Sequence, residues 1–170
     1  MIEIDVCSCY SGWTGPECLD TVCFGVNSTD VSVCSGKGSC VTPNKCDCIS
    51  GYTGAQCEIS VCYGVNQTDP TVCNGRGQCI APDTCDCASG YSGDKCELVN
   101  CFGRWSNDTQ VCAGHGQCTR KDHCQCSDGY LERDCSTPLC HEWFGDVKYA
   151  CSAHGECLAP DTCRCKNGNT

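Results

Sequence analysis

Residues 23–57 have the sequence CFGVNSTDVSVCSGKGSCVTPNKCDCISGYTGAQC, in which six cysteines follow the spacing C-x10-C-x5-C-x5-C-x-C-x8-C. The spacing returns along the chain, each time after four further residues. An unbroken period of this length predicts a repeat array rather than one large domain. The first cysteines of successive repeats, 39 residues apart, are Cys23, Cys62, Cys101 and Cys140. The complete repeats are 23–57, 62–96 and 101–135, and partial repeats occupy 1–18 and 140–170.

The chain has 26 cysteines in 170 residues, a share above the level that marks a disulfide scaffold. Leu, Ile, Val and Phe together number only 25, which is too few for a conventional hydrophobic core. A 35-residue unit with so little apolar surface must be stabilised by cross-links. A disulfide that closes a loop of about 15 residues removes roughly 3 kcal/mol of unfolded-state entropy in the chain-entropy model.

Such a framework persists only in an oxidising compartment, so we expect a protein that is secreted or exposed on the outer cell surface. The first five residues lack the basic start and the apolar stretch of a signal peptide. The sequence has no run of 18 apolar residues that would span a membrane. Because the chain begins and ends within a repeat, we expect a fragment of a longer array, with any signal or anchor outside it.

The formal net charge is −10, and acidic residues are spread over every repeat without a block of like charge. We interpret them as solvated surface, and the lack of a basic patch argues against nucleic acid as a partner. One basic residue nevertheless recurs at the paired-glycine turn of each repeat. Together these residues form a stripe for an anionic ligand, or each lies at a solvated turn tip. The many surrounding acidic residues favour the second interpretation. The basic residues are Lys37, Arg76, His115 and His154.

Clustered cysteines also occur in zinc sites, which usually contain a C-x2–4-C knuckle. This chain has no C-x2-C, and its close pairs are all C-x-C, as in Cys46/Cys48. The thioredoxin-type redox motif is absent for the same reason. No two histidines share a metal-ligand spacing. The cysteines therefore predict disulfides, with no metal and no cofactor, although spacing alone leaves 15 possible connectivities for six cysteines.

The stretches VCSGKGSC (33–40), VCNGRGQC (72–79), VCAGHGQC (111–118), CDCISGYTGAQC (46–57) and CDCASGYSGDKC (85–96) resemble the EGF-like module. The short loops around G-x-G are most similar to the tenascin/teneurin-type variant, although the ten-residue gap after the first cysteine is longer. The resemblance implies a fold that is mostly loop with short β-hairpins, strung as a linear rod of EGF-like modules. It further implies cysteine pairing 1–3, 2–4 and 5–6.

In the complete repeats, the implied pairs are Cys23–Cys40, Cys34–Cys46, Cys48–Cys57, Cys62–Cys79, Cys73–Cys85, Cys87–Cys96, Cys101–Cys118, Cys112–Cys124 and Cys126–Cys135. In the partial repeats, they are Cys9–Cys18, Cys140–Cys157 and Cys151–Cys163. The sequence does not identify partners for Cys7 and Cys165.

An Asn-x-Ser/Thr sequon stands in the long first loop of every complete repeat, at Asn27, Asn66 and Asn107. Three sequons in the same loop of three repeats predict N-glycans in an extracellular protein. By family resemblance, Ser39 matches the O-fucose acceptor pattern, and Thr53 and Ser92 match the O-GlcNAc pattern. These shorter motifs carry less information than the sequons.

Two aromatic residues recur in the repeats. One stands four residues after the fifth cysteine (Trp13, Tyr52, Tyr91, Tyr130), and the other follows the first cysteine (Phe24, Tyr63, Phe102). We expect the first ring either to pack on the start of the next repeat and stiffen the junction, or to pack on its own repeat's disulfide. The paired glycines, such as Gly36 and Gly38, are expected to supply positive φ at a turn.

The stretches before each first cysteine lack the D-x-D-E/Q ligand set of calcium-binding EGF-like modules, so we predict no calcium site. No catalytic residues are assigned, because no nucleophile motif and no deep pocket is expected. We therefore expect an extracellular structural glycoprotein, acting as a spacer or fibre subunit that contacts copies of itself. The alternative is the ectodomain of an adhesion or receptor protein. It would bind another extracellular protein through repeat-specific residues: Arg104, Trp105, Trp143 and Phe144.

Overall fold

A computed structural model describes residues 8–140, 151 and 155–165. The chain divides into two compact units, 1–87 and 88–170, and each is described by itself. The boundary between them lies inside the 62–96 repeat, so the units do not coincide with the sequence repeats. The described residues contain short strands and 3-10 turns but no α-helix, as expected for small β-hairpin modules held by disulfides.

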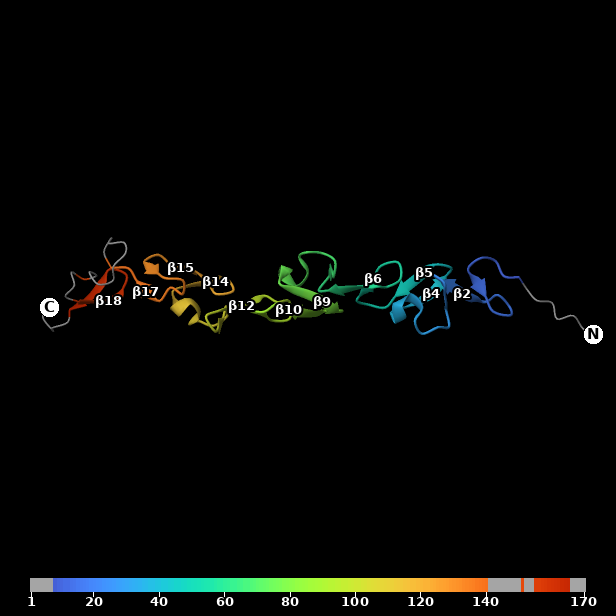
Figure 1. The fold of residues 1–170 in the computed structure, drawn as a ribbon, viewed down its shortest axis with the longest axis horizontal. Helices are drawn as coiled ribbons and strands as arrows, with labels where there is room; N and C mark the ends of the chain where they lie inside the picture. Colours follow the sequence, from blue (N-terminus) through green and yellow to red (C-terminus); the bar gives the residue numbers. More distant parts are fainter. Residues whose placement is uncertain (1–7, 141–150, 152–154, 166–170) are drawn as a thin grey trace, which may run out of the picture. The chain divides into compact units, whose positions relative to one another are not determined.

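Each complete repeat contains a two-stranded antiparallel hairpin, such as β4 (Gly38–Thr42) with β5 (Lys45–Cys48) in the first complete repeat (Figure 1). The third, fourth and fifth cysteines of the repeat lie on this hairpin, and Cys40 is the register partner of Cys46. Asn44 occupies the turn with φ of 57°, a left-handed conformation that Asn and Asp adopt more readily than most residues. The matching hairpins are β9 (Gly77–Ala81) with β10 (Thr84–Cys87), β14 (Gly116–Arg120) with β15 (His123–Cys126), and β18 (Gly155–Ala159) with β19 (Thr162–Cys165).

A tight turn that carries the second cysteine packs on each hairpin. In η1 (Val33–Gly36), three consecutive residues have left-handed backbones, with φ of 52° at Cys34, 58° at Ser35 and 67° at Gly36. This conformation is costly for residues with a side chain, and here the Cys34–Cys46 bond and the buried Val33 hold it. The same turn forms η2 (Val72–Gly75) and η3 (Val111–Gly114).

The residues that connect two repeats are not loose linkers but the central strand of a small sheet. In the first unit, β7 (Ile59–Cys62) lies between β6 (Tyr52–Thr53) of the preceding repeat and β8 (Val65–Asn66) of the following one. Equivalent three-stranded sheets are β1 (Trp13–Thr14), β2 (Asp20–Cys23), β3 (Val26–Asn27) and β11 (Tyr91–Ser92), β12 (Leu98–Cys101), β13 (Arg104–Trp105). A fourth junction pairs β16 (Tyr130–Leu131) with β17 (Thr137–Pro138).

Cysteine sulfur fills most of the interior of each repeat. One cluster contains Cys23, Val33, Cys34 and Cys57, and its counterpart in the second unit contains Cys101, Val111, Cys112, Cys124 and Cys135. The most deeply buried side chains among the described residues are all cysteines. The disulfides therefore serve both as cross-links and as the hydrophobic core.

Candidate functional site: the cysteine core, its lid and the sequon loops

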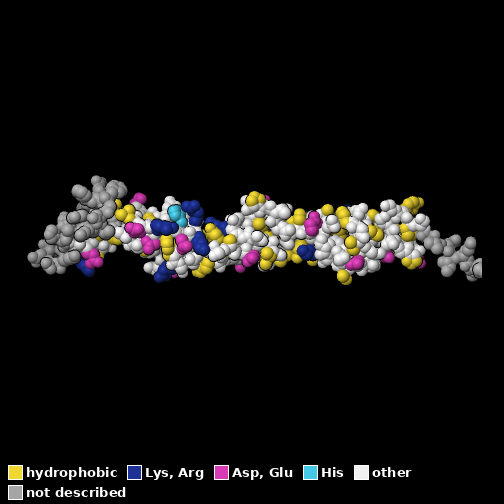
Figure 2. Space-filling model, viewed as in Figure 1, with side chains coloured by type: hydrophobic (Ala, Val, Ile, Leu, Met, Phe, Trp, Pro, Cys, Tyr) yellow, Lys and Arg dark blue, Asp and Glu magenta, His cyan; other side chains and the backbone are white. Residues whose placement is uncertain are grey.

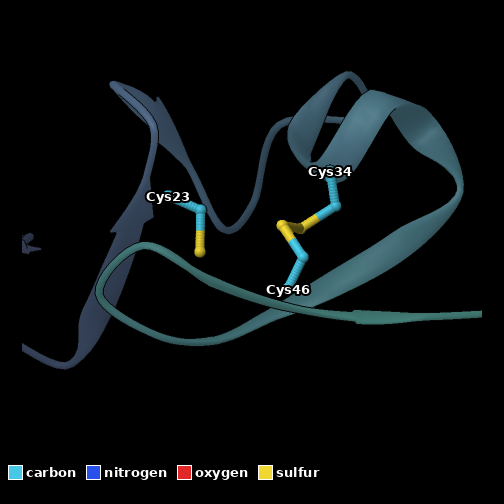
Figure 3. Close-up of side chains that lie close together, drawn as sticks. All are labelled: Cys23, Cys34 and Cys46. Atoms are coloured by element: carbon cyan, nitrogen blue, oxygen red, sulfur yellow. A yellow bond between two sulfur atoms is a disulfide. The ribbon is translucent and has the colours of Figure 1, made fainter. Parts of the chain in front are cut away.

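The two disulfides at the centre of a repeat lie side by side. Figure 3 shows the Cys34–Cys46 bond with the sulfur of Cys23 beside it. The three Sγ atoms lie within 4.8 Å of one another, and Cys23 is itself bonded to Cys40. The hairpin supplies Cys40 and Cys46, the 3-10 turn supplies Cys34, and the incoming strand supplies Cys23.

The structure forms a bond between the first and third, second and fourth, and fifth and sixth cysteines, which is the pairing that the family resemblance implies. In the first unit, the bonded pairs are Cys9–Cys18, Cys23–Cys40, Cys34–Cys46, Cys48–Cys57, Cys62–Cys79 and Cys73–Cys85. In the second unit, they are Cys101–Cys118, Cys112–Cys124, Cys126–Cys135, Cys140–Cys157 and Cys151–Cys163. Cys87 and Cys96 are also disulfide-bonded. Cys7 and the side chain of Cys165 lie outside the described residues.

The same sulfur clusters have the proximity of a metal site but not its chemistry. Zinc and other soft metals bind the deprotonated thiolate of cysteine. Every sulfur in these clusters belongs to a disulfide and has no thiolate to offer. The four clusters are Cys23/Cys34/Cys46, Cys62/Cys73/Cys85, Cys101/Cys112/Cys124 and Cys140/Cys151/Cys163.

The recurring tyrosine covers the disulfide core of its own repeat. Tyr52 packs against the cluster around Cys23, and Tyr130 packs against the cluster around Cys101. Between the two sequence-based alternatives, the structure thus places these rings on their own repeat. The backbone of the tyrosine takes part in the junction sheet, because β6 begins at Tyr52 and pairs with β7.

The recurring basic residue covers the outer face of that tyrosine. The Lys37 ammonium lies 4.5 Å from the centroid of the Tyr52 ring. In the second unit, the His115 ring stacks on Tyr130 with centroids 3.8 Å apart and planes at 8°. These residues are half-buried partners of an aromatic ring, whereas the sequence pattern favoured solvated turn tips. On the face drawn in Figure 2, cationic and anionic side chains are interspersed.

The two glycines that flank this basic residue serve different purposes. Gly36 has φ of 67°, as the turn pattern predicts. Gly38 does not have a positive φ, so that expectation was wrong for it. A Cβ atom at Gly38 would meet the Asp47 carbonyl oxygen at 2.5 Å and the Cys57 Sγ at 2.7 Å. This position requires glycine because backbone and disulfide approach it closely.

Two of the three sequon asparagines, Asn27 and Asn66, lie in edge strands of the junction sheets, and Asn107 lies in the turn after β13. Asn27 is the last residue of β3 and the register partner of Val22, and Asn66 is the last residue of β8 and the partner of Val61. The Thr29 N–H and hydroxyl both donate to Asn27 Oδ1 at 2.9 Å. Asn66 and Asn107 are exposed and Asn27 is half-buried. Among the O-glycan candidates, Ser39 is exposed on β4, and Thr53 and Ser92 are half-buried on β6 and β11.

Acidic residues stabilise the same loops by local hydrogen bonds. Asp30 Oδ1 accepts bonds from the Ser32 N–H and hydroxyl at 2.8 and 2.7 Å, and these bonds lower the pKa of Asp30. The Thr71 hydroxyl and N–H lower the pKa of Asp69 in the same way. At Asp108, the Gln110 N–H and then the Arg104 guanidinium lower the pKa.

The EGF-like domain family model matches residues 28–57 and 67–96. Each match begins inside the long first loop and contains the second to sixth cysteines. No curated protein matched the chain. With the repeated hairpins and disulfides, these matches make the chain a tandem EGF-like repeat protein.

EGF-like domains with many disulfides are typical of extracellular proteins, and proteins built from them are generally not enzymes. No helix among the described residues is long and apolar enough to cross a membrane. Trp143, Phe144 and His154 lie outside the described residues, so the contact surface expected at Trp143 and Phe144 remains a prediction.

Proposed function

We propose that the chain is part of an extracellular structural glycoprotein whose EGF-like repeats, joined by stiff junctions, form a rod-like spacer. The shared strand β7 carries the proposal. The Val61 N–H donates to the Gly51 carbonyl of the preceding repeat at 2.9 Å, and the Val61 carbonyl accepts the Asp83 N–H of the following repeat at 3.2 Å. A connecting residue whose two backbone groups are bonded to different repeats cannot rotate freely.

The same pair of bonds at the other described junctions supports a general role for this geometry. In each case, the fourth connecting residue, directly before the first cysteine of the next repeat, donates to a glycine carbonyl before it and accepts from a hairpin-turn N–H after it. The residues are Val22 between Gly12 and Asn44, Asn100 between Gly90 and Asp122, and Leu139 between Gly129 and Asp161. The short connection leaves no Gly/Ser-rich segment that would act as a flexible tether.

Small-angle X-ray scattering of the secreted chain tests the spacer function. The wild type should give the scattering of an extended particle. Val61→Pro removes the N–H that bonds to Gly51 and should introduce a bend, which shortens the maximum dimension. Val61→Ala keeps the N–H and is the matched control, expected to scatter like the wild type.

Peptide mapping must show that both variants keep the wild-type disulfides, so that a change in shape is not caused by misfolding. Scattering of a compact wild-type particle would contradict the spacer. An unchanged maximum dimension in Val61→Pro would contradict the role of the shared strand.

A further inference from the structure

Trp105 is an exposed aromatic residue two positions before a sequon asparagine, in the stretch Trp105-Ser106-Asn107-Asp108-Thr109. Trp105 is 37% exposed, so part of the residue is open to water. We propose that Trp105 is the platform on which the first N-acetylglucosamine of an N-glycan at Asn107 stacks. The inference rests on the proposed glycoprotein function.

The backbone brings the two residues onto one turn. The Asp108 N–H donates to the Trp105 carbonyl at 2.9 Å, which closes a four-residue turn with Trp105 first and Asn107 third. The ends of such a turn lie within about 7 Å. Asn107 lies inside this turn, two residues after Trp105, so a sugar bonded to Nδ2 of the exposed Asn107 begins within reach of the indole.

The turn is held in place before any sugar is attached. The Ser106 N–H donates to the Val99 carbonyl at 2.8 Å, and the Val99 N–H donates to Ser106 Oγ at 3.1 Å. The Arg104 guanidinium pairs with the Asp108 carboxylate at 2.9 Å, across the same turn. A platform that is already ordered loses little conformational entropy when a ligand packs on it.

The chemistry of the two surfaces is complementary. One face of the N-acetylglucosamine ring presents C–H groups, which are weakly positive, while its hydroxyl and N-acetyl groups extend toward water. The face of an indole is large, apolar and weakly negative. Stacking would remove both apolar faces from water without burying a polar group.

The other two sequons provide an internal comparison. In the junction sheets, Trp105 pairs with Asn100, just as Asn27 pairs with Val22 and Asn66 pairs with Val61. The sequon of the third repeat is thus shifted by two residues, and an indole stands where the other repeats have the asparagine.

Two residues before Asn27 and Asn66, the chain has Gly25 and Gly64, which have no side chain. The four-residue turns there begin at the asparagine itself, since Asp30 and Asp69 donate to the carbonyls of Asn27 and Asn66. Phe24 and Tyr63 stand three residues before Asn27 and Asn66 and lie outside these turns. Of the three sequons, the one at Asn107 is therefore the one with an aromatic residue in the same turn.

NMR spectroscopy of the full chain, secreted from eukaryotic cells and trimmed by an endoglycosidase to one N-acetylglucosamine per site, tests the proposal. The sugar at Asn107 should show nuclear Overhauser contacts to the Trp105 indole and ring-current shifts to higher field. The sugars at Asn27 and Asn66, which have a glycine two residues before the asparagine, should show no contacts to an indole of their own turn. Trp105→Ala should abolish the shifts at Asn107, and Trp105→Phe should retain part of them.

Occupied Asn107 without indole contacts would overturn the platform and leave the glycoprotein proposal standing. Unoccupied Asn107 would overturn the platform, and absence of glycan from all three sequons would overturn the glycoprotein function as well. If Trp105→Ala does not fold, the contacts in the wild-type protein decide the question alone.

Discussion

Gly51 of one repeat lies against Pro82 of the next, and a Cβ atom at Gly51 would meet the Pro82 Cβ at 2.4 Å. The contact recurs at the other described junctions, with Gly12 against Pro43 and Gly129 against Pro160, and with Gly90 against the flexible side chain of Lys121. Each hairpin tip therefore fits beneath the preceding repeat only because a glycine is there. The junction is defined by steric fit as well as by the bonds of Val61.

We expect Gly51→Ala to weaken this junction. The new Cβ would clash with the Pro82 ring, and overpacking of this kind costs about 1–3 kcal/mol. A further ~1 kcal/mol comes from the φ of 89° at this position. Denaturant unfolding measures the total loss of stability, and hydrogen exchange at the Val61 amide reports whether the junction itself opens more often.

Gly64→Ala is the matched control for that prediction. Gly64 has a similar φ of 83°, but a Cβ there would meet nothing within 4 Å. The control therefore has the backbone strain without the clash. Equal destabilisation by the two substitutions would show that the contact with Pro82 has no energetic role.

Non-reducing peptide mapping should recover the pairs Cys62–Cys79 and Cys73–Cys85, which the structure forms in the 62–96 repeat. The reason is geometric: Cys79 and Cys85 are register partners on one hairpin, and each bonds to a cysteine that arrives from another segment. A Cys85–Cys87 bond would contradict the whole framework. Retention of zinc in place of the bonds would contradict it equally.

Loss of the Lys37 ammonium should destabilise the first complete repeat by about 0.5–1 kcal/mol, the usual scale of a cation–π contact that remains accessible to water. Lys37→Met removes the charge above Tyr52 but keeps most of the side-chain volume. Lys45→Met, at an exposed position of β5, removes the same charge elsewhere and should have a smaller effect on the urea midpoint. Similar midpoints for the two variants would mean that the contact with Tyr52 contributes nothing.

The regular cysteine spacing predicted the repeats and, through the family resemblance, the hairpins, because these depend on local order along the chain. The shared strand was not predicted. The four residues Glu58–Val61 connect two repeats and include the β-branched Ile59 and Val61, which favour a strand. The strand β7 forms because it pairs with β6 of the preceding repeat and β8 of the following one. A local sequence pattern does not reveal this pairing.

The positions of Lys37 and Gly38 show a different limit. Their recurrence was visible, but their partners are Tyr52 and Cys57, which lie 15 and 19 residues later in the chain. A spacing pattern shows that a residue recurs and not what it touches. The sequence therefore suggested a turn tip and a positive φ, whereas packing against the core determines both residues.

Acid should weaken the loop that contains Asp69. The Thr71 hydroxyl and N–H lower the pKa of Asp69 from its ordinary value of 3.8, so these bonds favour the carboxylate in the folded state. Their stabilising effect is fully present above the unfolded-state pKa and is lost as the pH falls through the lower folded-state pKa. An NMR titration of the Asp69 carboxyl carbon should therefore give a midpoint below 3.8.

Thr71→Val removes only the hydroxyl donor, so the pKa of Asp69 should rise toward its ordinary value while staying below it. Thr84→Val is the control, because the Thr84 hydroxyl donates to the Pro82 carbonyl and not to Asp69. A titration midpoint that does not change in Thr71→Val would show that the hydroxyl bond is absent in solution.

Glycosylation of the first sequon should depend on Thr29 alone among its neighbours. The Thr29 hydroxyl donates to Asn27 Oδ1, and a hydroxyl residue at this position defines the acceptor sequence. In protein secreted from eukaryotic cells, Thr29→Ala should abolish the glycan at Asn27, whereas Thr29→Ser and Ser28→Ala should retain it. Mass spectrometry after amidase treatment, which converts a glycosylated Asn to Asp, measures occupancy at each site. Unchanged occupancy at Asn66 and Asn107 serves as the internal control, and an Asn27 that is unmodified in the wild type would remove this site from the proposed glycoprotein.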